Sequence, residues 1–291
     1  MVFGSNRLKK VKYSELEKSV GWLADRVTIS HFVNVMGAVF IWGRAHHTND
    51  PIEGFTPNFA RLLLSGLSCF AALAGVYIEV FQFPWALKTD ERFKFFHKNV
   101  FGYFLFLTLW CETVCCIYVT FGFLAELSTW PQVGMEPMWW LHRFCYALSP
   151  FANSTAVTLA ILFMKFCWFD KEWHNGYIVL WTERGWPGIV YKSLYTHLIW
   201  IVLSVLDIVY LRSWFPHLTY PLQYQLQWSS FFAVFYISCM FAFREWSGLW
   251  PYPFLAHFSG LHKTIFFSVI FVFVNGMTCG TFYAITAGRT P

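Results

Sequence analysis

The chain has 291 residues, of which 57% are hydrophobic and only 13% are charged. A soluble domain is nearer a quarter charged, and the apolar stretches are too numerous for one buried core. The composition therefore excludes a soluble globular protein and predicts an all-α, polytopic membrane helix bundle. The net charge of +5 does not indicate nucleic-acid binding, because most basic residues stand at the ends of apolar stretches.

The eight cysteines all fall within or beside apolar stretches. This distribution argues against a secreted disulfide scaffold, and none of the cysteines has the spacing of zinc ligands. The adjacent His46 and His47 are a weak metal signal, because neighbours on a helix point apart and no further ligands follow. We therefore expect neither a metal site nor a cofactor.

Residues 1–58 are predicted to form a basic arm, an amphipathic helix and a short apolar segment. Ser14 and Glu17 have the spacing of a capping box, and apolar residues follow them at helical intervals. Such a helix lies on the membrane surface or docks on protein. Residues 28–43 are apolar but short, so they either cross the bilayer or lie half-buried.

Six longer apolar stretches follow, and each is predicted to cross the bilayer. They cover residues 62–83, 99–127, 139–167, 193–211, 228–243 and 264–285. With residues 28–43 they predict six to seven transmembrane helices in a bundle over residues 59–287, and residues 288–291 form a tail. Pro150 is expected to kink the third stretch. Small residues in the first of them predict close helix packing: Ser65, Ser68, Ala71, Ala72 and Gly75.

The basic residues also predict an orientation. With seven crossings, 16 of the 21 Lys and Arg residues fall on one side of the membrane and 5 on the other. The positive-inside rule then places the N-terminus inside. If residues 28–43 do not cross, only the N-terminal arm changes side.

The stretch 99–127 carries Thr108 and Glu112 one helical turn apart, on one face. Thr108 lies roughly 15 Å from the inner end of its helix, and His197 lies roughly 8 Å from the inner end of its own. Because a histidine is the usual base that activates a hydroxyl, these two residues are a candidate catalytic pair. The alternative is structural: Thr108 would bond the carbonyl of Phe104, and His197 would sit among lipid headgroups.

Four motifs carry a resemblance to a known family. The most specific is the run Trp250-Pro251-Tyr252-Pro253-Phe254-Leu255, which precedes an aromatic-rich last helix. Three further motifs stand earlier in the chain, in the same order as in that family. They are the triplet Phe106-Leu107-Thr108, the stretch Leu141 to Pro150 and the helix from His197 to Asp207. Over about residues 60–287 the chain resembles the androgen-induced-gene/ADTRP family of membrane proteins.

This resemblance implies an intramembrane threonine hydrolase that cleaves fatty-acid esters of hydroxy fatty acids. It gives the role of nucleophile to Thr108 and the role of base to His197, with Asp207 where the family has an acid. Three departures leave open the alternative that the fold was kept while the activity was lost. Ala256 stands where the family has an acid, residues 1–58 have no counterpart, and two long loops are enlarged.

A second class of function is structural. The 34 Phe, 16 Trp and 14 Tyr residues suit helices that pack on lipid and on neighbouring chains. The chain would then be a non-catalytic accessory subunit of a large membrane complex, such as a mitochondrial respiratory-chain or ATP synthase assembly. Membrane lipids are expected partners in either case. A hydrolase is expected in an endomembrane or the plasma membrane, and such a subunit in the mitochondrial inner membrane.

Haem binding is a third class, and the sequence disfavours it. Bis-histidine ligation needs histidines at matched depth on facing helices. The histidines near the ends of the predicted spans lack such spacing: His97, His142, His197 and His262.

Overall fold

The computed structural model describes residues 48–78, 107–171, 174–179, 182, 188–247, 250, 252 and 254–287. These residues form helices and loops, without a strand. The expected basic arm, amphipathic helix and crossing at 28–43 lie outside the described residues, as does the tail at 288–291.

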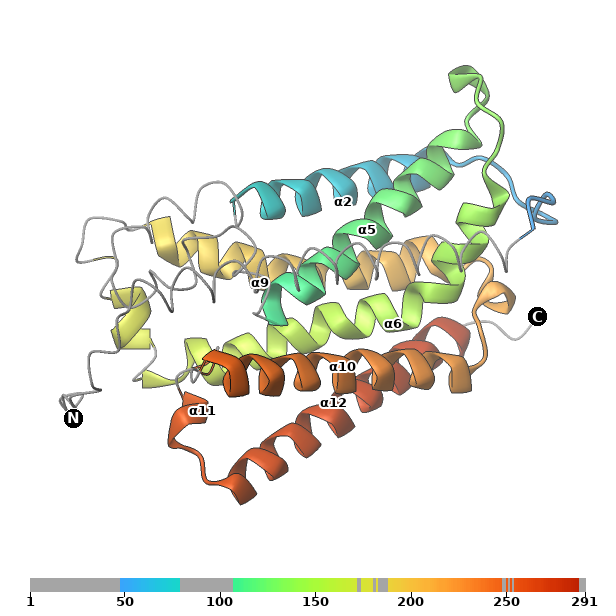
Figure 1. The fold of residues 1–291 in the computed structure, drawn as a ribbon. Coiled ribbons are helices and arrows are strands. Elements are labelled where there is room, and N and C mark those ends of the chain that lie inside the picture. Colours follow the sequence, from blue (N-terminus) through green and yellow to red (C-terminus); the bar gives the residue numbers. More distant parts are fainter. Residues whose placement is uncertain are drawn as a thin grey trace.

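Six long helices build the described part of the chain, and Figure 1 shows them running side by side. They are α2 (Phe59–Tyr77), α5 (Leu107–Ser128), α6 (Trp139–Phe163), α9 (Gly188–Leu206), α10 (Leu222–Ser247) and α12 (Gly260–Thr286). Helix α6 is central, because it packs against α5, α9, α10 and α12. Short turns connect or extend them: Pro131–Val133, Met164–Trp168, His174–Val179, Asp207–Arg212, Pro216–Leu218 and α11 (Phe254–His257).

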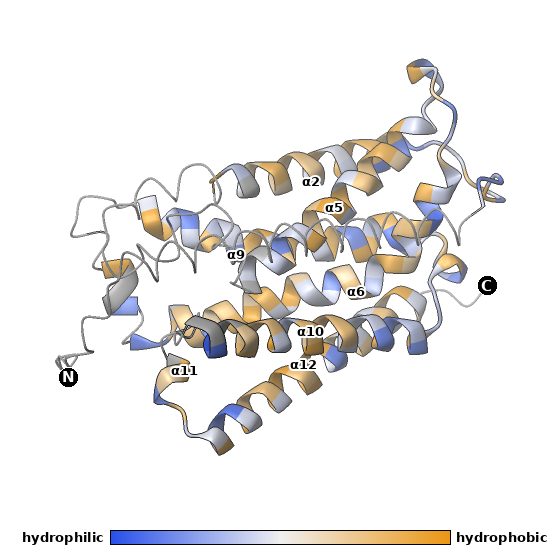
Figure 2. Ribbon diagram, in the orientation of Figure 1, coloured by the Kyte–Doolittle hydropathy of each residue, from blue (hydrophilic) through white to orange (hydrophobic). Residues whose placement is uncertain are grey.

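Four of the described segments are long and apolar enough to cross a membrane, namely Trp110–Ser128, Trp139–Trp168, Gly188–Arg212 and Gly260–Thr286. Figure 2 shows hydrophobic residues on most faces of the long helices, as expected where one side meets protein and the other meets lipid. The prediction of an all-helical, multi-pass membrane protein is confirmed. The count of six to seven spans stays a prediction.

Several helix ends differ from the sequence prediction. The described part of helix α9 already includes Gly188, before the predicted start at residue 193, and α12 begins at Gly260 rather than at residue 264. The apolar run marks only the part of a helix in hydrocarbon, whereas polar residues continue the same helix beyond it. In α12 the polar end is capped, because the side chain of Ser259 accepts a hydrogen bond from the amide of His262. Helix α6 continues through Pro150.

The small-residue face of α2 packs as predicted. Ser65, Ser68 and Ala72 are buried, and α2 contacts both α5 and α9. A Cβ atom added at Gly66 would lie 3.2 Å from the ring of Phe123 on α5. On the α9 side, Tyr195 donates a hydrogen bond to the carbonyl of Ala71 over 2.8 Å. Small side chains thus bring the three helices close together.

Candidate active site

Thr108 and His197 lie on different helices and their side chains meet. Thr108 is in the first described turn of α5, and His197 is in the middle of α9. Thr108 Oγ1 lies 3.3 Å from His197 Nε2, although the two residues are 89 positions apart. The imidazole is 9% exposed. The structure therefore brings the two candidate residues together in the interior of the protein.

The hydrogen bonds around His197 define which nitrogen carries the proton. Nδ1 lies 2.7 Å from the carbonyl oxygen of Ser193, which can only accept. The hydroxyl of Thr196 also lies near Nδ1, at 3.2 Å, and its own proton is donated to the carbonyl of Lys192. Both contacts require a proton on Nδ1. Nε2 is then the acceptor, so the contact with Thr108 is an O–H···N hydrogen bond.

The plane of the imidazole is fixed by an aromatic neighbour. The ring of Phe163, at the end of α6, stacks on His197 with a centroid distance of 3.6 Å and an interplanar angle of 13°. The Phe163 ring on one face and the Ser193 carbonyl at the edge together allow the imidazole of His197 only one orientation. That orientation points Nε2 at the hydroxyl of Thr108.

His197 lies nine residues after Gly188, the first described residue of α9, which is about 14 Å along the helix axis at 1.5 Å per residue. The depths of His197 and Thr108 in the bilayer stay predictions.

This arrangement is chemically suited to base-assisted attack by a hydroxyl. The neutral imidazole can accept the hydroxyl proton, which is what a weak oxygen nucleophile needs. In the described part of the chain no carboxylate contacts the ring, so the Ser193 carbonyl takes the place of an orienting acid. Glu112, one turn along α5 from Thr108, is 1% exposed and belongs to the bundle interior.

Asp207 lies elsewhere and joins a separate cluster. It begins the π-helical turn that extends α9, ten residues after His197, and pairs with Arg212 Nε at 3.1 Å. Three further groups donate to its carboxylate: the Tyr118 hydroxyl at 2.6 Å, the Ser149 hydroxyl at 3.0 Å and the Asn153 amide at 2.7 Å. Asp207 is thus remote from the Thr108–His197 pair.

A second buried polar group also escaped the sequence analysis. Arg61 and Glu126 form an ion pair at 3.5 Å, and His142 Nδ1 lies 4.0 Å from the Glu126 carboxylate. Arg61 and Arg212 are two of the five basic residues that the charge count assigned to the less basic side of the membrane, but they are only 5% and 2% exposed. The counter-charge of Arg61 is Glu126 on another helix, so no local sequence signal could reveal it, whereas the counter-charge of Arg212 is Asp207 in the same π-helical turn.

The fold and the paired side chains define a multi-pass helical membrane protein with a hydroxyl–imidazole pair between two helices. Comparison with known families narrows this class. The model of the FAR-17a/AIG1-like protein family matches residues 67–282, more than half of the chain. The chain belongs to this family, and the resemblance seen in its motifs is confirmed. No curated protein and no solved structure matches the chain.

Proposed function

We propose that the protein is an intramembrane threonine hydrolase that cleaves fatty-acid esters of hydroxy fatty acids. Thr108 is the nucleophile and His197 is the general base. The observation that carries this proposal is the 3.3 Å contact between Thr108 Oγ1 and the proton-accepting Nε2 of His197. Membership of the FAR-17a/AIG1-like family supports it.

In the first half-reaction, Thr108 Oγ1 attacks the ester carbonyl carbon while its proton passes to His197 Nε2. The tetrahedral intermediate then collapses and its bond to the alcohol oxygen breaks. That oxygen takes the proton from His197 and leaves as the hydroxyl of the hydroxy fatty acid. The products of this step are the free hydroxy fatty acid and an acyl ester on Thr108.

In the second half-reaction, His197 takes a proton from water, and the oxygen of that water attacks the acyl ester. Collapse releases the fatty acid and returns the proton to Thr108. The imidazole carries a positive charge during both steps. The Ser193 carbonyl at Nδ1 and the π-face of Phe163 stabilise that charge, since a carbonyl dipole and an aromatic face both attract a cation.

The test is hydrolysis by purified full-length protein. Thr108→Ala and His197→Ala should each lower kcat/KM by roughly a thousandfold or more, because each removes a group from the reacting set. Thr120→Ala is the matched control: Thr120 is on the same helix, where it accepts a weak hydrogen bond from Cys69. Activity that survives Thr108→Ala would remove Thr108 as nucleophile.

The alternative proposal is a non-catalytic accessory subunit of a large membrane complex. It draws on a stripe of exposed apolar side chains along α2: Phe59, Leu63, Leu67, Phe70, Leu73 and Tyr77. Gentle solubilisation of the native membrane separates the two proposals. A species that migrates as one 34.2 kDa chain in detergent would contradict the proposal that the protein is a subunit of a larger complex. Location in the mitochondrial inner membrane would favour it over the hydrolase.

A further inference from the structure

A buried lysine lies in the helical turn that carries His197, and the two half-reactions give it no role. Lys192 on α9 is 8% exposed. Its backbone carbonyl accepts the hydroxyl proton of Thr196 over 3.0 Å, and the next residue, Ser193, orients the imidazole. Because an ammonium group loses its hydration when it is buried, lysine is almost never buried unless an acceptor or a counter-charge offsets the cost.

The ammonium group of Lys192 is close enough to the imidazole of His197 for the two to interact electrostatically. Lys192 precedes His197 by five residues, about 7.5 Å along the helix axis. Both residues are in the first half of Gly188–Arg212, a segment long and apolar enough to cross the membrane. Lys192 is therefore the nearer of the two to the membrane surface at this end of the helix.

Three Lys or Arg side chains are buried in the part of the chain that the structure describes, and their surroundings differ. Arg61 pairs with Glu126, and Arg212 pairs with Asp207. Lys192 is the one that shares a turn with His197. It also interacts with other groups of the protein, and a substrate group would join or replace those interactions.

The proposed substrate carries a group that a lysine binds well. A fatty-acid ester of a hydroxy fatty acid has one free carboxylate, at the end of the hydroxy-acid chain. A charged group is costly inside hydrocarbon, so this carboxylate stays nearer to the membrane surface than the ester bond does. An ammonium group has three N–H donors, and its hydrogen bonds to a carboxylate are roughly twice as strong as those between neutral groups.

A carboxylate at Lys192 also favours the reaction at His197. Both half-reactions place a positive charge on the imidazole, and the ammonium group of Lys192 opposes that charge because like charges repel. A bound carboxylate cancels this repulsion. An ester without a free carboxylate lacks both the binding contact and the compensation.

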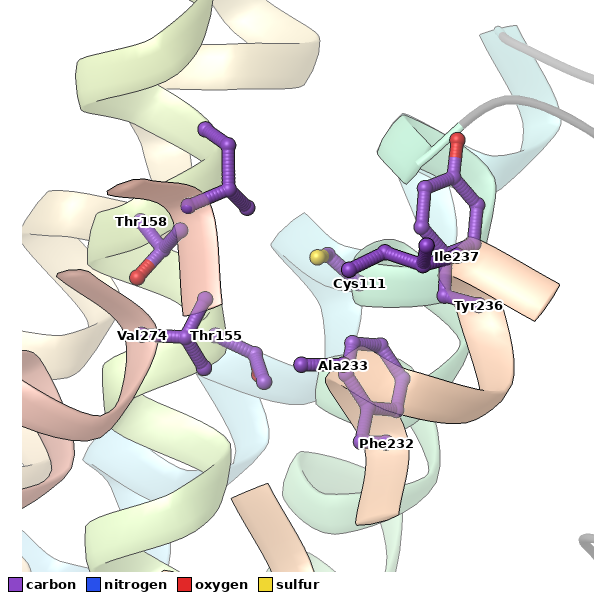
Figure 3. A pocket seen from close by; sticks show the side chains of 9 residues that line it. Cys111, Thr155, Thr158, Phe232, Ala233, Tyr236, Ile237 and Val274 are labelled. Carbon is purple, nitrogen blue, oxygen red and sulfur yellow. The ribbon is translucent and has the colours of Figure 1, made fainter. Parts of the chain in front are cut away.

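The cavity between α5, α6, α10 and α12 offers no alternative site for the substrate (Figure 3). It has room for about one water molecule, so an alkyl chain does not enter it. One lining residue, Thr158, has a buried hydroxyl that makes no hydrogen bond with the described residues. Recognition of the substrate therefore does not involve this cavity.

We propose that Lys192 binds the free carboxylate of the substrate and makes the protein selective for esters that carry this group. The assignment rests on the proposed hydrolase function. In the bound state the ammonium group donates to a carboxylate oxygen while the ester carbonyl carbon is at Thr108 Oγ1. The hydroxy-acid chain spans the distance between the two residues.

The first experiment compares two substrates in phosphatidylcholine nanodiscs: the palmitate ester of hydroxystearic acid, and the same ester with its carboxylate capped as a methyl ester. The full-length protein should hydrolyse the free acid with the higher kcat/KM. Lys192→Met should lower kcat/KM for the free acid by roughly tenfold or more, because it removes a charge-assisted hydrogen bond. The value for the methyl ester should not fall, since the repulsion at His197 is removed as well.

Two further variants control this measurement. Lys192→Arg keeps the positive charge and should keep the preference for the free acid. Lys165→Met should leave both substrates unaffected, since Lys165 is an exposed lysine two residues after Phe163. A ratio of the two kcat/KM values that is unchanged in Lys192→Met, or equal values for the two substrates in the unmodified protein, overturns the proposal.

The second experiment does not depend on turnover. Equilibrium binding of tritiated hydroxystearic acid and of its methyl ester is measured with the Thr108→Ala protein in the same nanodiscs, with empty nanodiscs as the blank. Adding Lys192→Met should weaken binding of the acid by roughly tenfold and leave binding of the methyl ester unchanged. An equal change for both compounds, or no change for either, contradicts the proposal.

The two experiments separate failure of the carboxylate site from failure of the hydrolase. If Thr108→Ala and His197→Ala retain hydrolysis while Lys192→Met weakens binding of the acid alone, the catalytic pair is wrong and the carboxylate site stands. If both variants lose hydrolysis while Lys192→Met changes neither ratio, the pair stands and Lys192 does not recognise the substrate.

Discussion

Helix α9 and its π-helical extension carry two buried polar centres that differ in kind. His197 meets Thr108 through one hydrogen bond to Nε2. Asp207, about 15 Å further along, accepts from four side-chain donors on three elements. A carboxylate that accepts from four donors on packed elements holds helices together, whereas a hydroxyl that donates to an imidazole nitrogen is placed for proton transfer. Burial alone therefore does not distinguish a structural centre from a reactive one.

Among the variants that test the difference between the two centres, substitution of Asp207 is expected to have the largest effect, and that effect is on stability. Asp207→Ala leaves Arg212 as a buried charge without its partner, which costs about 3–5 kcal/mol. The thermal midpoint in detergent should fall by roughly 10 °C. Replacing both charges together, Asp207→Leu with Arg212→Met, should restore only part of the loss, because the donors on Tyr118, Ser149 and Asn153 then lack this acceptor. A variant that keeps its midpoint but loses hydrolysis would place Asp207 in the catalytic machinery instead.

A smaller loss of stability is expected when a larger side chain is placed next to Arg212 in the Asp207 cluster. A Cβ atom at Gly122 would lie 2.8 Å from Arg212 Nη2, and Asp207 and Tyr118 hold that side chain in place. Gly122→Ala should therefore destabilise the protein by about 1–3 kcal/mol. Gly280→Ala on α12 is the control, because a Cβ there meets no atom within 4 Å. Equal midpoints for the two variants would show that Arg212 is free to move.

At the His197 centre the expected effects are on rate. Phe163→Leu keeps most of the buried volume but removes the stacked ring, a contact worth about 0.5–1.5 kcal/mol. We expect kcat/KM to fall about tenfold, with a change in stability below about 1.5 kcal/mol. Phe169→Leu is the control, since that ring is 70% exposed. An unchanged rate would mean that the imidazole is oriented without Phe163.

The smallest effect is expected at Thr196. Thr196→Val removes the hydroxyl that lies 3.2 Å from Nδ1, while the Ser193 carbonyl still accepts the Nδ1 proton. The rate should fall about twofold, since the lost contact is at the weak end for a hydrogen bond, about 0.5 kcal/mol. The readout is kcat/KM at equal protein content. A loss as large as that of His197→Ala would mean that Thr196, not Ser193, sets the tautomer.

Much of the fold follows from the sequence because hydrocarbon admits few backbone arrangements. Apolar runs predict the helices, and the small residues of α2 predict the surface that contacts α5 and α9. The helix ends do not follow, since α12 begins at Gly260 in polar sequence that no hydropathy signal marks.

The candidate site was predictable only in part. The resemblance singles out Thr108 and His197, but spacing cannot bring together residues 89 positions apart on separate helices. The tautomer depends on Ser193 and Thr196, one turn and one residue before the histidine, and these polar residues look ordinary in sequence. The partners of Asp207 come from α5, α6 and the turn after α9, so they appear only once the helices are packed.

The most direct test of the Thr108–His197 pair is the covalent intermediate itself. Full-length protein is mixed with a fatty-acid ester of a hydroxy fatty acid, quenched in acid, digested and examined by mass spectrometry. The account predicts the mass of one acyl group on the peptide that contains Thr108, and its absence in the His197→Ala protein. An acyl group on another residue, or acylation at an unchanged rate without His197, would contradict it.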